Sequence, residues 1–401
     1  MHSHITKPLV LFVALCLAVL CLSFSVSAEP KYQANSTFGP KLTGGVSDEF
    51  LEKARAEGNL GEKPLRLSAI TDEDLRKVTS LKDILTGVEI DNAKELTDIS
   101  PLGKLSNLTY VKLERLDKVT DLSPLGNLTK LKKLHIRQVP YESFDFLKPL
   151  DNLEELVFFM QPKQPSDISA LAGKKNMKIL HFYSAQITDI SPLVDSTELE
   201  DLSLYMTETE DLSPLTAFPK LRRLSLYSVP AKDLSPVGEL TELRSIWIYA
   251  TKFEDYSPLA KLTKLEELHA GISHFDRMDV VRSMPNLRSV KLLRDKVTDF
   301  TPLAECKELR EAVLEGMHVG DLSIFANATK LERLDLENST VSNPEAIAAL
   351  PALSALDLQK TEGVTDISIF KDLPKLNYIY SKKGQFPEEQ LAPFEKKAVV
   401  Q

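Results

Sequence analysis

Histidines are the residues of this sequence whose type best suits metal binding or acid–base chemistry near neutral pH. Three of them, His135, His181 and His269, fall on outward positions of predicted strands. Since adjacent strands lie about 4.8 Å apart, His135 and His181 are about 10 Å apart, and His269 lies about 19 Å beyond His181. No two of these side chains could share a zinc ion. The sequence also lacks GxSxG, HExxH, phosphate-loop and dinucleotide-binding motifs. We therefore expect that the protein is not an enzyme and binds neither a metal ion nor a cofactor.

Aromatic residues form a second set of outward side chains. One outward position, followed along successive predicted strands, holds Phe159, Tyr183, Tyr205, Tyr227 and Tyr249. Aromatic residues make up only 7% of the chain, so composition does not explain this run. The neighbouring outward position holds Trp247, the only tryptophan of the chain, together with His135, His181 and His269. Five rings on adjacent strands predict a stripe roughly 20 Å long.

This aromatic stripe has two interpretations. Exposed contiguous apolar surface usually has a use, and Tyr and Trp dominate interface energetics. Stacked aromatic residues also stabilise parallel sheets without binding anything. The first interpretation predicts a ligand-binding surface made of Phe159, Tyr183, Tyr205, Tyr227, Tyr249, Trp247, His181, Arg223 and His269.

Charged residues beside the stripe change sign along the chain. In order they are Glu154, Glu155, Glu200, Asp201, Arg222, Arg223, Arg244, Glu266 and Glu267. Such a series is either an ordinary solvated face or a mosaic that matches a charged partner, which would set specificity more than affinity. Both interpretations stay open.

These side chains are positioned by a repeat. Strand centres are predicted at Val88, Val111, Leu134, Leu156, Leu180, Leu202, Leu224, Ile246, Leu268, Val290, Ala312, Leu334, Leu356 and Ile379. From Leu180 to Leu356 every interval is 22 residues. Within each unit apolar and polar residues alternate, as Leu202 and Leu204 do with Ser203, which is typical of a strand with one buried face. One unit cannot bury its leucines alone, so the units must stack into a solenoid with a parallel sheet.

A second motif follows the strands. Asp-Ile-Ser-Pro-Leu stands at 98–102 and Asp-Leu-Ser-Pro-Leu at 121–125, with relatives at 189, 211, 233, 255 and 299. Ser before Pro favours the start of a helix. The next strand begins about seven residues later, so each helix must be a single turn, of α or 3₁₀ type.

The repeats resemble the leucine-rich repeats of bacterial internalins. The resemblance rests on the LxxLxL strands, the 22-residue period and the D-[IL]-S-P-L segment, and covers roughly residues 70–387. It implies a right-handed α/β horseshoe with the parallel sheet on the concave face and short 3₁₀ or α turns on the convex face. The Asn that usually follows the strand is replaced by Thr207, Val229, Thr251, Ser273, Asp295, Met317, Ser339 and Thr361. We expect neither an immunoglobulin-like segment nor a wall-sorting signal.

The N-terminus predicts export. An apolar run from Leu9 to Val26 follows Lys7, and Val26-Ser27-Ala28 fits signal peptidase. Cleavage after Ala28 is expected, and no membrane span is expected after removal of the signal. Retention of the run as an anchor stays an alternative. The predicted divisions are a signal peptide over 1–28, a flexible lead-in over 29–46, an N-terminal helical cap over 47–80, about 14 repeats over 81–387 and a C-terminal cap over 388–401.

Composition limits the partners. The net charge of −9 becomes −10 once residues 1–28, which carry Lys7 and no acid, are removed. An acidic protein of this kind has no general attraction to nucleic acid or anionic lipid. Two of the three cysteines lie in the predicted signal peptide and are removed with it. The third, Cys306, is expected to be a small buried apolar residue rather than a reactive thiol.

Three functions fit this sequence. The leading hypothesis is a secreted or periplasmic module that holds a protein or peptide partner on its concave aromatic face. Carbohydrate binding is the second, because aromatic platforms also stack on sugar rings. The third is a structural envelope protein without a specific ligand. The sequence leaves the partner, the organism and the oligomeric state undetermined.

Overall fold

Strands recur along the chain at the predicted positions in the computed structural model, which describes residues 31–33, 40–57, 60, 63–159, 165–183, 186–394 and 398–400. Each predicted strand centre lies inside a strand. The strands are β4 (Gly87–Asp91), β5 (Tyr110–Glu114), β6 (Lys133–Arg137), β7 (Glu155–Phe159), β8 (Ile179–Tyr183), β9 (Asp201–Tyr205), β10 (Arg223–Tyr227), β11 (Ser245–Tyr249), β12 (Glu267–Gly271), β13 (Ser289–Leu293), β14 (Glu311–Glu315), β16 (Arg333–Asp335), β18 (Ala355–Asp357) and β19 (Tyr378–Tyr380).

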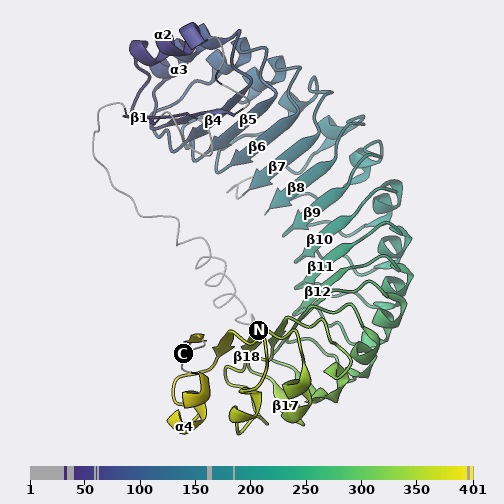
Figure 1. Cartoon of the computed structure of the whole chain (residues 1–401). Coiled ribbons are helices and arrows are strands. Elements are labelled where there is room, and N and C mark those ends of the chain that lie inside the picture. Colours follow the sequence, from purple (N-terminus) through teal and green to yellow (C-terminus); the bar gives the residue numbers. More distant parts are fainter. Residues whose placement is uncertain are drawn as a thin grey trace, which may run out of the picture.

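These strands form one parallel sheet that lines the inner side of an arc (Figure 1). The sheet has eighteen strands within the described residues, because β1 (Lys31–Gln33), β2 (Lys41–Thr43) and β3 (Leu65–Ser68) precede β4 and β20 (Ala398–Val400) follows β19. Only β1 pairs antiparallel among these strands. The curved parallel sheet confirms the predicted right-handed leucine-rich-repeat horseshoe.

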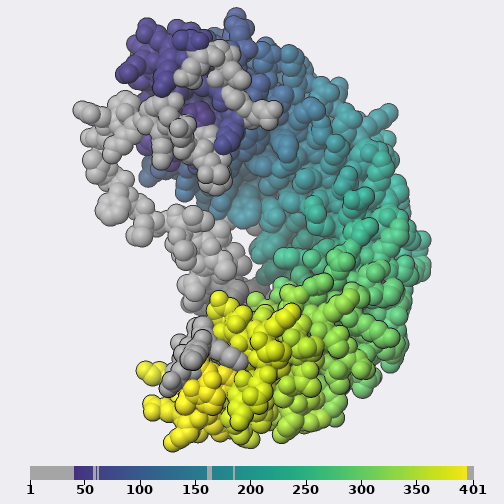
Figure 2. Space-filling model, viewed as in Figure 1, coloured from purple at the N-terminus to yellow at the C-terminus, as the bar shows by residue number. Residues whose placement is uncertain are grey.

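The register aligns the predicted centres exactly as the repeat requires. Leu202 of β9 pairs with Leu224 of β10, and Leu224 pairs with Ile246 of β11. These side chains are buried between successive units, and so are those two residues farther along each strand, such as Leu204. Burying a leucine contributes about 1.5–3 kcal/mol, so the stacked rows supply most of the stability. Figure 2 shows the units packed against one another along the whole arc.

The convex side carries 3₁₀ helices, as predicted. In a typical unit, Asp211 accepts hydrogen bonds from the Ser213 backbone N–H at 2.8 Å and from its hydroxyl at 2.9 Å, which fixes the turn before Pro214. The helices are η1 (Thr79–Leu81), η2 (Ser100–Lys104), η3 (Ser123–Asn127), η4 (Asp145–Leu147), η5 (Ser169–Leu171), η6 (Ser191–Leu193), η7 (Ser213–Ala217), η8 (Ser235–Glu239), η9 (Ser257–Lys261), η10 (Met278–Ser283), η11 (Thr301–Glu305), η12 (Leu322–Phe325), η13 (Pro344–Ala349), η14 (Ser368–Phe370) and η15 (Ala392–Phe394).

The positions that replace the usual Asn are only partly hydrogen-bonded. The Ser273 backbone N–H and hydroxyl donate to Asp295 Oδ1 at 2.8 and 3.0 Å. The Met317 N–H donates to Ser339 Oγ at 3.0 Å. By contrast, the Thr207 and Thr251 hydroxyls and Asp295 Oδ2 are buried without a hydrogen-bond partner among the described residues. The Asp295 N–H also donates to Met317 Sδ at 3.3 Å, so hydrogen bonds connect Ser273, Asp295, Met317 and Ser339 but do not extend along the whole row.

The N-terminal end differs from the sequence prediction. Helices α2 (Asp48–Glu57) and α3 (Asp72–Val78) lie in the predicted cap, and α3 begins with a capping box between Thr71 and Asp74. However, β3 lies between these helices and pairs with β4, so the sheet begins before residue 81. Residues 41–43 were expected in a flexible lead-in, but they form β2 and pair with β3.

The C-terminal end is covered by α4 (Glu388–Leu391), η15 and β20. A C-terminal cap was predicted over 388–401, and within it α4 is four residues long and is followed by a 3₁₀ turn. A second, two-stranded sheet pairs β15 (His318–Asp321) with β17 (Thr340–Ser342). Neither of these strands was predicted.

Two further sequence expectations concern Cys306 and the membrane. Cys306 is buried, and burial raises the pKa of its thiol to about 11, as expected of an unreactive core residue. No helix among the described residues is both long and apolar enough to cross a bilayer. The predicted signal peptide lies outside the described residues.

Candidate functional site

The five aromatic residues predicted on the concave face stand side by side. Phe159, Tyr183, Tyr205, Tyr227 and Tyr249 occupy one register position on β7 to β11 and are called the aromatic ladder below. Successive ring centroids are 4.6, 5.5, 4.1 and 6.2 Å apart. The closest pair, Tyr205 and Tyr227, is stacked with 12° between the ring planes. Parallel in-register strands impose this stacking, because the strand spacing is close to the distance at which rings pack.

Every ring of the aromatic ladder is only partly buried. The ladder therefore offers a nearly continuous aromatic surface rather than a sealed core. Burial raises the pKa of Tyr205, and burial together with the nearby Asp295 carboxylate raises the pKa of Tyr249 to about 12. The hydroxyl groups of Tyr205 and Tyr249 consequently stay neutral near pH 7 and keep their protons for hydrogen bonding.

The two ends of the aromatic ladder contact different residues. At the first end, the Arg137 guanidinium lies 4.8 Å from the centre of the Phe159 ring, and its Nη1 lies 3.4 Å from Glu114 Oε1. At the other end, the Tyr249 ring lies over Gly271, where a Cβ atom would come within 2.4 Å of Tyr249 Cε1. The absence of a side chain at Gly271 thus leaves space for the Tyr249 ring.

Trp247 adds a large ring beside the aromatic ladder. Its exposed fraction is 47%, among the highest of the large apolar side chains in the described residues. The indole lies 6.4 Å from Tyr249 and 5.0 Å from His269, centre to centre. His269 itself is buried, and its Nε2 lies 3.0 Å from Ser289 Oγ. Burial and Lys291 lower the pKa of His269 to about 4, so the ring is neutral and supports Trp247 from below.

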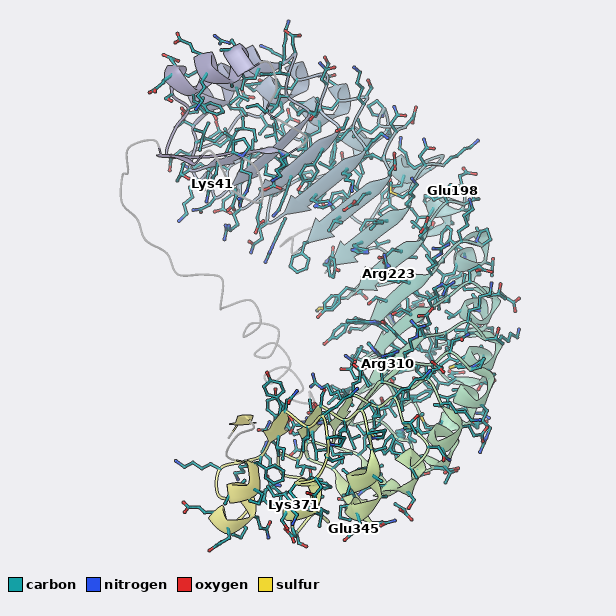
Figure 3. All side chains as sticks on the ribbon, viewed as in Figure 1. Lys41, Glu198, Arg223, Arg310, Glu345 and Lys371 are labelled. Atoms are coloured by element: carbon teal, nitrogen blue, oxygen red, sulfur yellow. The ribbon has the colours of Figure 1, made fainter. Side chains whose placement is uncertain are left out.

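His181 and Arg223 meet at one carboxylate. His181 Nε2 lies 3.0 Å from Asp201 Oδ1, and Arg223 Nε donates to Asp201 Oδ2 at 2.7 Å. Burial opposes ionisation of Asp201, but the two partners lower its pKa overall. The predicted site residues are therefore one connected surface, except that His269 lies beneath it. Figure 3 shows Arg223 nearer the hollow of the arc than Glu198.

The change of charge sign along the face is largely neutralised between neighbouring strands. Glu154 lies 2.8 Å from both Lys132 and Lys178. Glu266 likewise lies 2.5 Å from Arg244 and 3.1 Å from Arg288. The sequence showed the signs of these charges but not that Glu154 and Glu266 each lie between bases of the two neighbouring repeats. This part of the face is a solvated ion-pair series, in which exposed pairs contribute little stability.

Additional apolar residues extend the surface. Met206 and Ile272 follow β9 and β12 and are 47% and 44% exposed, and Leu293 of β13 continues the register of the aromatic ladder. The sequence analysis missed them because they lie outside the strand or after the aromatic run. A signal existed, since an apolar residue directly after a strand faces solvent in this repeat.

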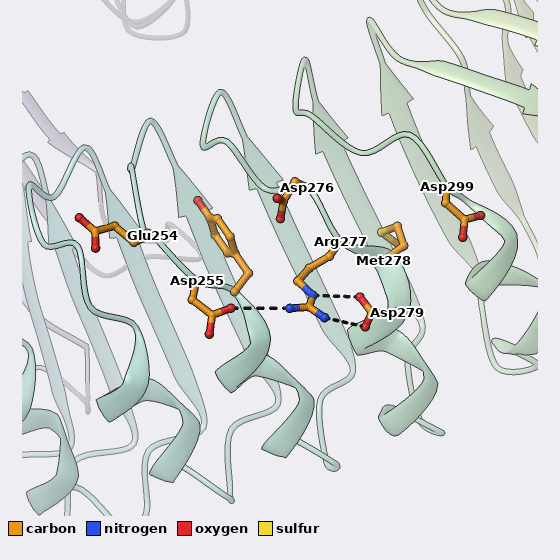
Figure 4. Close-up of a pocket in the computed structure, with 8 residues that line it drawn as sticks. Glu254, Asp255, Asp276, Arg277, Met278, Asp279 and Asp299 are labelled. Carbon is orange, nitrogen blue, oxygen red and sulfur yellow. Dashed lines mark hydrogen bonds and ion pairs between the residues drawn. The ribbon is translucent and has the colours of Figure 1, made fainter.

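A second hollow of about 540 Å³ lies at the start of η9, η10 and η11. There Arg277 stands where neighbouring repeats carry Asp255 and Asp299, and it donates two hydrogen bonds of 3.0 Å to Asp279 (Figure 4). Arg277 Nη1 also lies 3.7 Å from Asp255 Oδ1. The arginine thus separates like charges of adjacent repeats. In the parts of the chain that the structure describes, no group of three or more His, Cys, Asp or Glu could hold a metal ion.

Known structures resemble this architecture. An internalin from Listeria monocytogenes is 27% identical, with a TM-score of 0.62 over 82% of this chain and 93% of that one. A leucine-rich-repeat protein from Leptospira interrogans gives a TM-score of 0.71 at 18% identity, over 89% of this chain and 93% of that one. The functional domain of InlJ from Listeria monocytogenes gives 0.53 at 18% identity, over 76% and 69%.

No family model and no curated protein sequence matches the chain. The fold nevertheless defines its class, because a parallel inner sheet, a 22-residue period and convex 3₁₀ turns are the features of a leucine-rich-repeat solenoid. Within that class the likeness to the Listeria protein makes it an internalin-like leucine-rich-repeat protein. InlJ includes a cysteine ladder, whereas Cys306 is the only cysteine in the repeats of this chain.

Proposed function

We propose that this protein is a secreted or periplasmic binding module that holds a protein or peptide partner on its concave aromatic surface. The aromatic ladder carries this proposal. Its five adjacent rings remain partly exposed although the core between the repeats is complete without them. Half-exposed Tyr and Trp side chains on a rigid sheet bind at low entropic cost, because they have few torsions to fix.

Alanine at Tyr205, Tyr227 and Trp247 together is expected to abolish partner capture from the native envelope and medium. The substitutions remove the two most closely stacked rings and the exposed indole while leaving the buried leucines in place. Affinity capture with the purified protein, followed by identification of bound proteins, measures the loss.

The matched control is the Val194→Ala/Tyr378→Ala variant, which removes two exposed apolar side chains that lie outside the aromatic ladder. It should capture the same partner as the wild-type protein. Equal capture by the triple variant would contradict the proposal. An uncharged glycan that quenches Trp247 fluorescence, without any captured protein, would favour carbohydrate binding, and tolerance of the triple substitution without a saturable ligand would favour a structural role.

Export is proposed from the apolar run Leu9–Val26 and the Val26-Ser27-Ala28 site alone. We expect the mature protein to begin at Glu29. N-terminal sequencing of protein from the envelope and from the medium measures this and separates the two locations. A chain that keeps residues 1–28 would show that the segment is an anchor. The expectation that the protein is not an enzyme stays a prediction.

A further inference from the structure

The aromatic ladder continues into carboxylates on the same concave face. Beyond Gly271 and Leu293, its register position is occupied by Glu315 at the end of β14 and then by Glu337. The register position of Trp247 leads similarly to Asp335 of β16 and Asp357 of β18, which pair directly. These four residues, Glu315, Glu337, Asp335 and Asp357, are called the acidic zone below.

Carboxylates on the earlier strands of this face hold cations of the chain itself. Glu155 lies 2.7 Å from His135 and 2.8 Å from Lys133, and Asp201 is shared by His181 and Arg223. The hydrogen bond from His135, with that from Lys133, lowers the pKa of Glu155 to about 2. These positions are already neutralised and need no partner.

The acidic zone is less well neutralised. Arg333 lies 3.1 Å from Asp335, Lys360 lies 3.4 Å from Glu337 and Arg294 lies 3.7 Å from Glu315. Asp357 has no ion pair among the described residues and accepts hydrogen bonds from Gln359. Burial and repulsion from Glu337 raise the pKa of Glu315, and burial, with repulsion from Asp335, raises that of Asp357. A cation brought by a partner would relieve this repulsion.

The first end of the aromatic ladder shows how a cation fits between a ring and a carboxylate. There, one register position runs from Glu114 through Arg137 to Phe159, and Arg137 contacts both neighbours. At the other end, the same register position runs from Tyr249 through Gly271 and Leu293 to Glu315. It has a ring and a carboxylate but no basic residue between them.

We infer that the partner is a basic polypeptide segment whose apolar or aromatic side chains lie on the aromatic ladder and whose Lys or Arg side chain reaches the acidic zone. This inference rests on the function proposed above and adds the charge of the partner. Three strand spacings separate Tyr249 from Glu315, about 14 Å, which roughly four extended residues span. An uncharged sugar would gain nothing from these carboxylates, and nucleic acid would be repelled by them.

The test uses three synthetic decapeptides with blocked ends that alternate Trp with Lys, Ser or Glu, titrated calorimetrically into the mature protein. The wild-type protein should bind the lysine peptide at least about tenfold more tightly than the glutamate peptide at low salt, with a preference that shrinks as salt is added. The Glu315→Gln/Asp357→Asn variant should lose this preference and keep its affinity for the serine peptide.

The matched control is Glu254→Gln/Asp276→Asn, which removes the same charge beside the second hollow and should keep the preference. No binding of the lysine peptide at millimolar concentration, equal binding of lysine and glutamate peptides, or an unchanged preference in the Glu315→Gln/Asp357→Asn variant would overturn the inference. The triple alanine variant at Tyr205, Tyr227 and Trp247 separates the proposed function from the inferred charge of the partner. If this variant binds every peptide like the wild-type protein, the proposed function fails. If it loses binding while the acidic zone has no effect, only the charge of the partner is wrong.

Discussion

At pH 7, the free energy of unfolding of the Asp295→Asn variant is expected to be about 3 kcal/mol larger than that of the wild-type protein. The variant is therefore expected to be more stable. Burial raises the pKa of Asp295 to about 6, and its Oδ2 atom has no hydrogen-bond partner among the described residues. Ionising this carboxyl group in the folded protein is therefore costly. Asparagine keeps the acceptor for Ser273, removes the charge and restores the residue usual in this repeat.

The sign of the pH dependence follows from the raised pKa. Between about pH 4 and pH 6 the folded protein holds this proton more tightly than the unfolded chain, so the free energy of unfolding falls as pH rises. The advantage of the variant should thus be complete above pH 6 and shrink below about 1 kcal/mol at pH 4. Urea unfolding at both pH values measures it. His269, whose pKa is lowered to about 4, acts oppositely in the same range but is common to both proteins.

The control for this experiment is Asp299→Asn, four residues away. Asp299 is exposed and accepts a hydrogen bond from the Thr301 N–H at 2.9 Å, and hydrogen bonds from Thr301 lower its pKa. Its substitution should destabilise the protein at pH 7 and matter less in acid. If Asp295→Asn also destabilises the protein at pH 7, the buried charge does not have the assigned cost.

Replacement of Phe158 by alanine is expected to lower the free energy of unfolding by about 3–5 kcal/mol. Phe158 is fully buried between repeats, with its ring centre 5.9 Å from that of Phe182 and 4.9 Å from that of Phe144. The cavity would interrupt contact between neighbouring units, and in a solenoid each unit is supported only by its neighbours. Urea unfolding followed by circular dichroism measures the loss.

Phe159, the next residue, provides the comparison, because it points to the opposite face of the same strand and begins the aromatic ladder. Phe159→Ala should cost no more than about 1 kcal/mol, the range of a cross-strand pair. Similar losses for both variants would mean that the aromatic ladder is part of the structural core. That result would favour sheet support over ligand binding for the exposed rings.

The repeat made the strands and their outward positions predictable, because the 22-residue interval recurs from Leu180 to Leu356 and apolar and polar residues alternate within a unit such as Leu199–Met206. Strand β3 was missed although Leu65 precedes Val88 by 23 residues, since the helical pattern on either side of it dominated. β2 offers only three residues and depends on β3 for its pairing. Such strands form through tertiary contacts, which local pattern does not report.

The same limit applies to the site. The sequence placed Trp247 and His269 on one outward position, but only the structure shows that His269 is buried while the indole stays exposed. It likewise gave the sign of Arg223 without its distance from Asp201. The side of the sheet on which a side chain lies follows from the two-residue period of a strand. Whether that side chain is buried or ion-paired depends on the sizes and charges of the residues in the neighbouring repeats.

The equal spacing of the repeats has an evolutionary consequence. Because each interval from Leu180 to Leu356 is 22 residues, in-frame duplication or loss of one unit leaves every remaining side chain on its original face. Such an event between Gly271 and Glu315 would change the distance from the rings to the carboxylates by one strand spacing, about 4.8 Å. Among related proteins, the length of the partner segment that is recognised would therefore change in multiples of one strand spacing. The residues that make the contacts would not need to change.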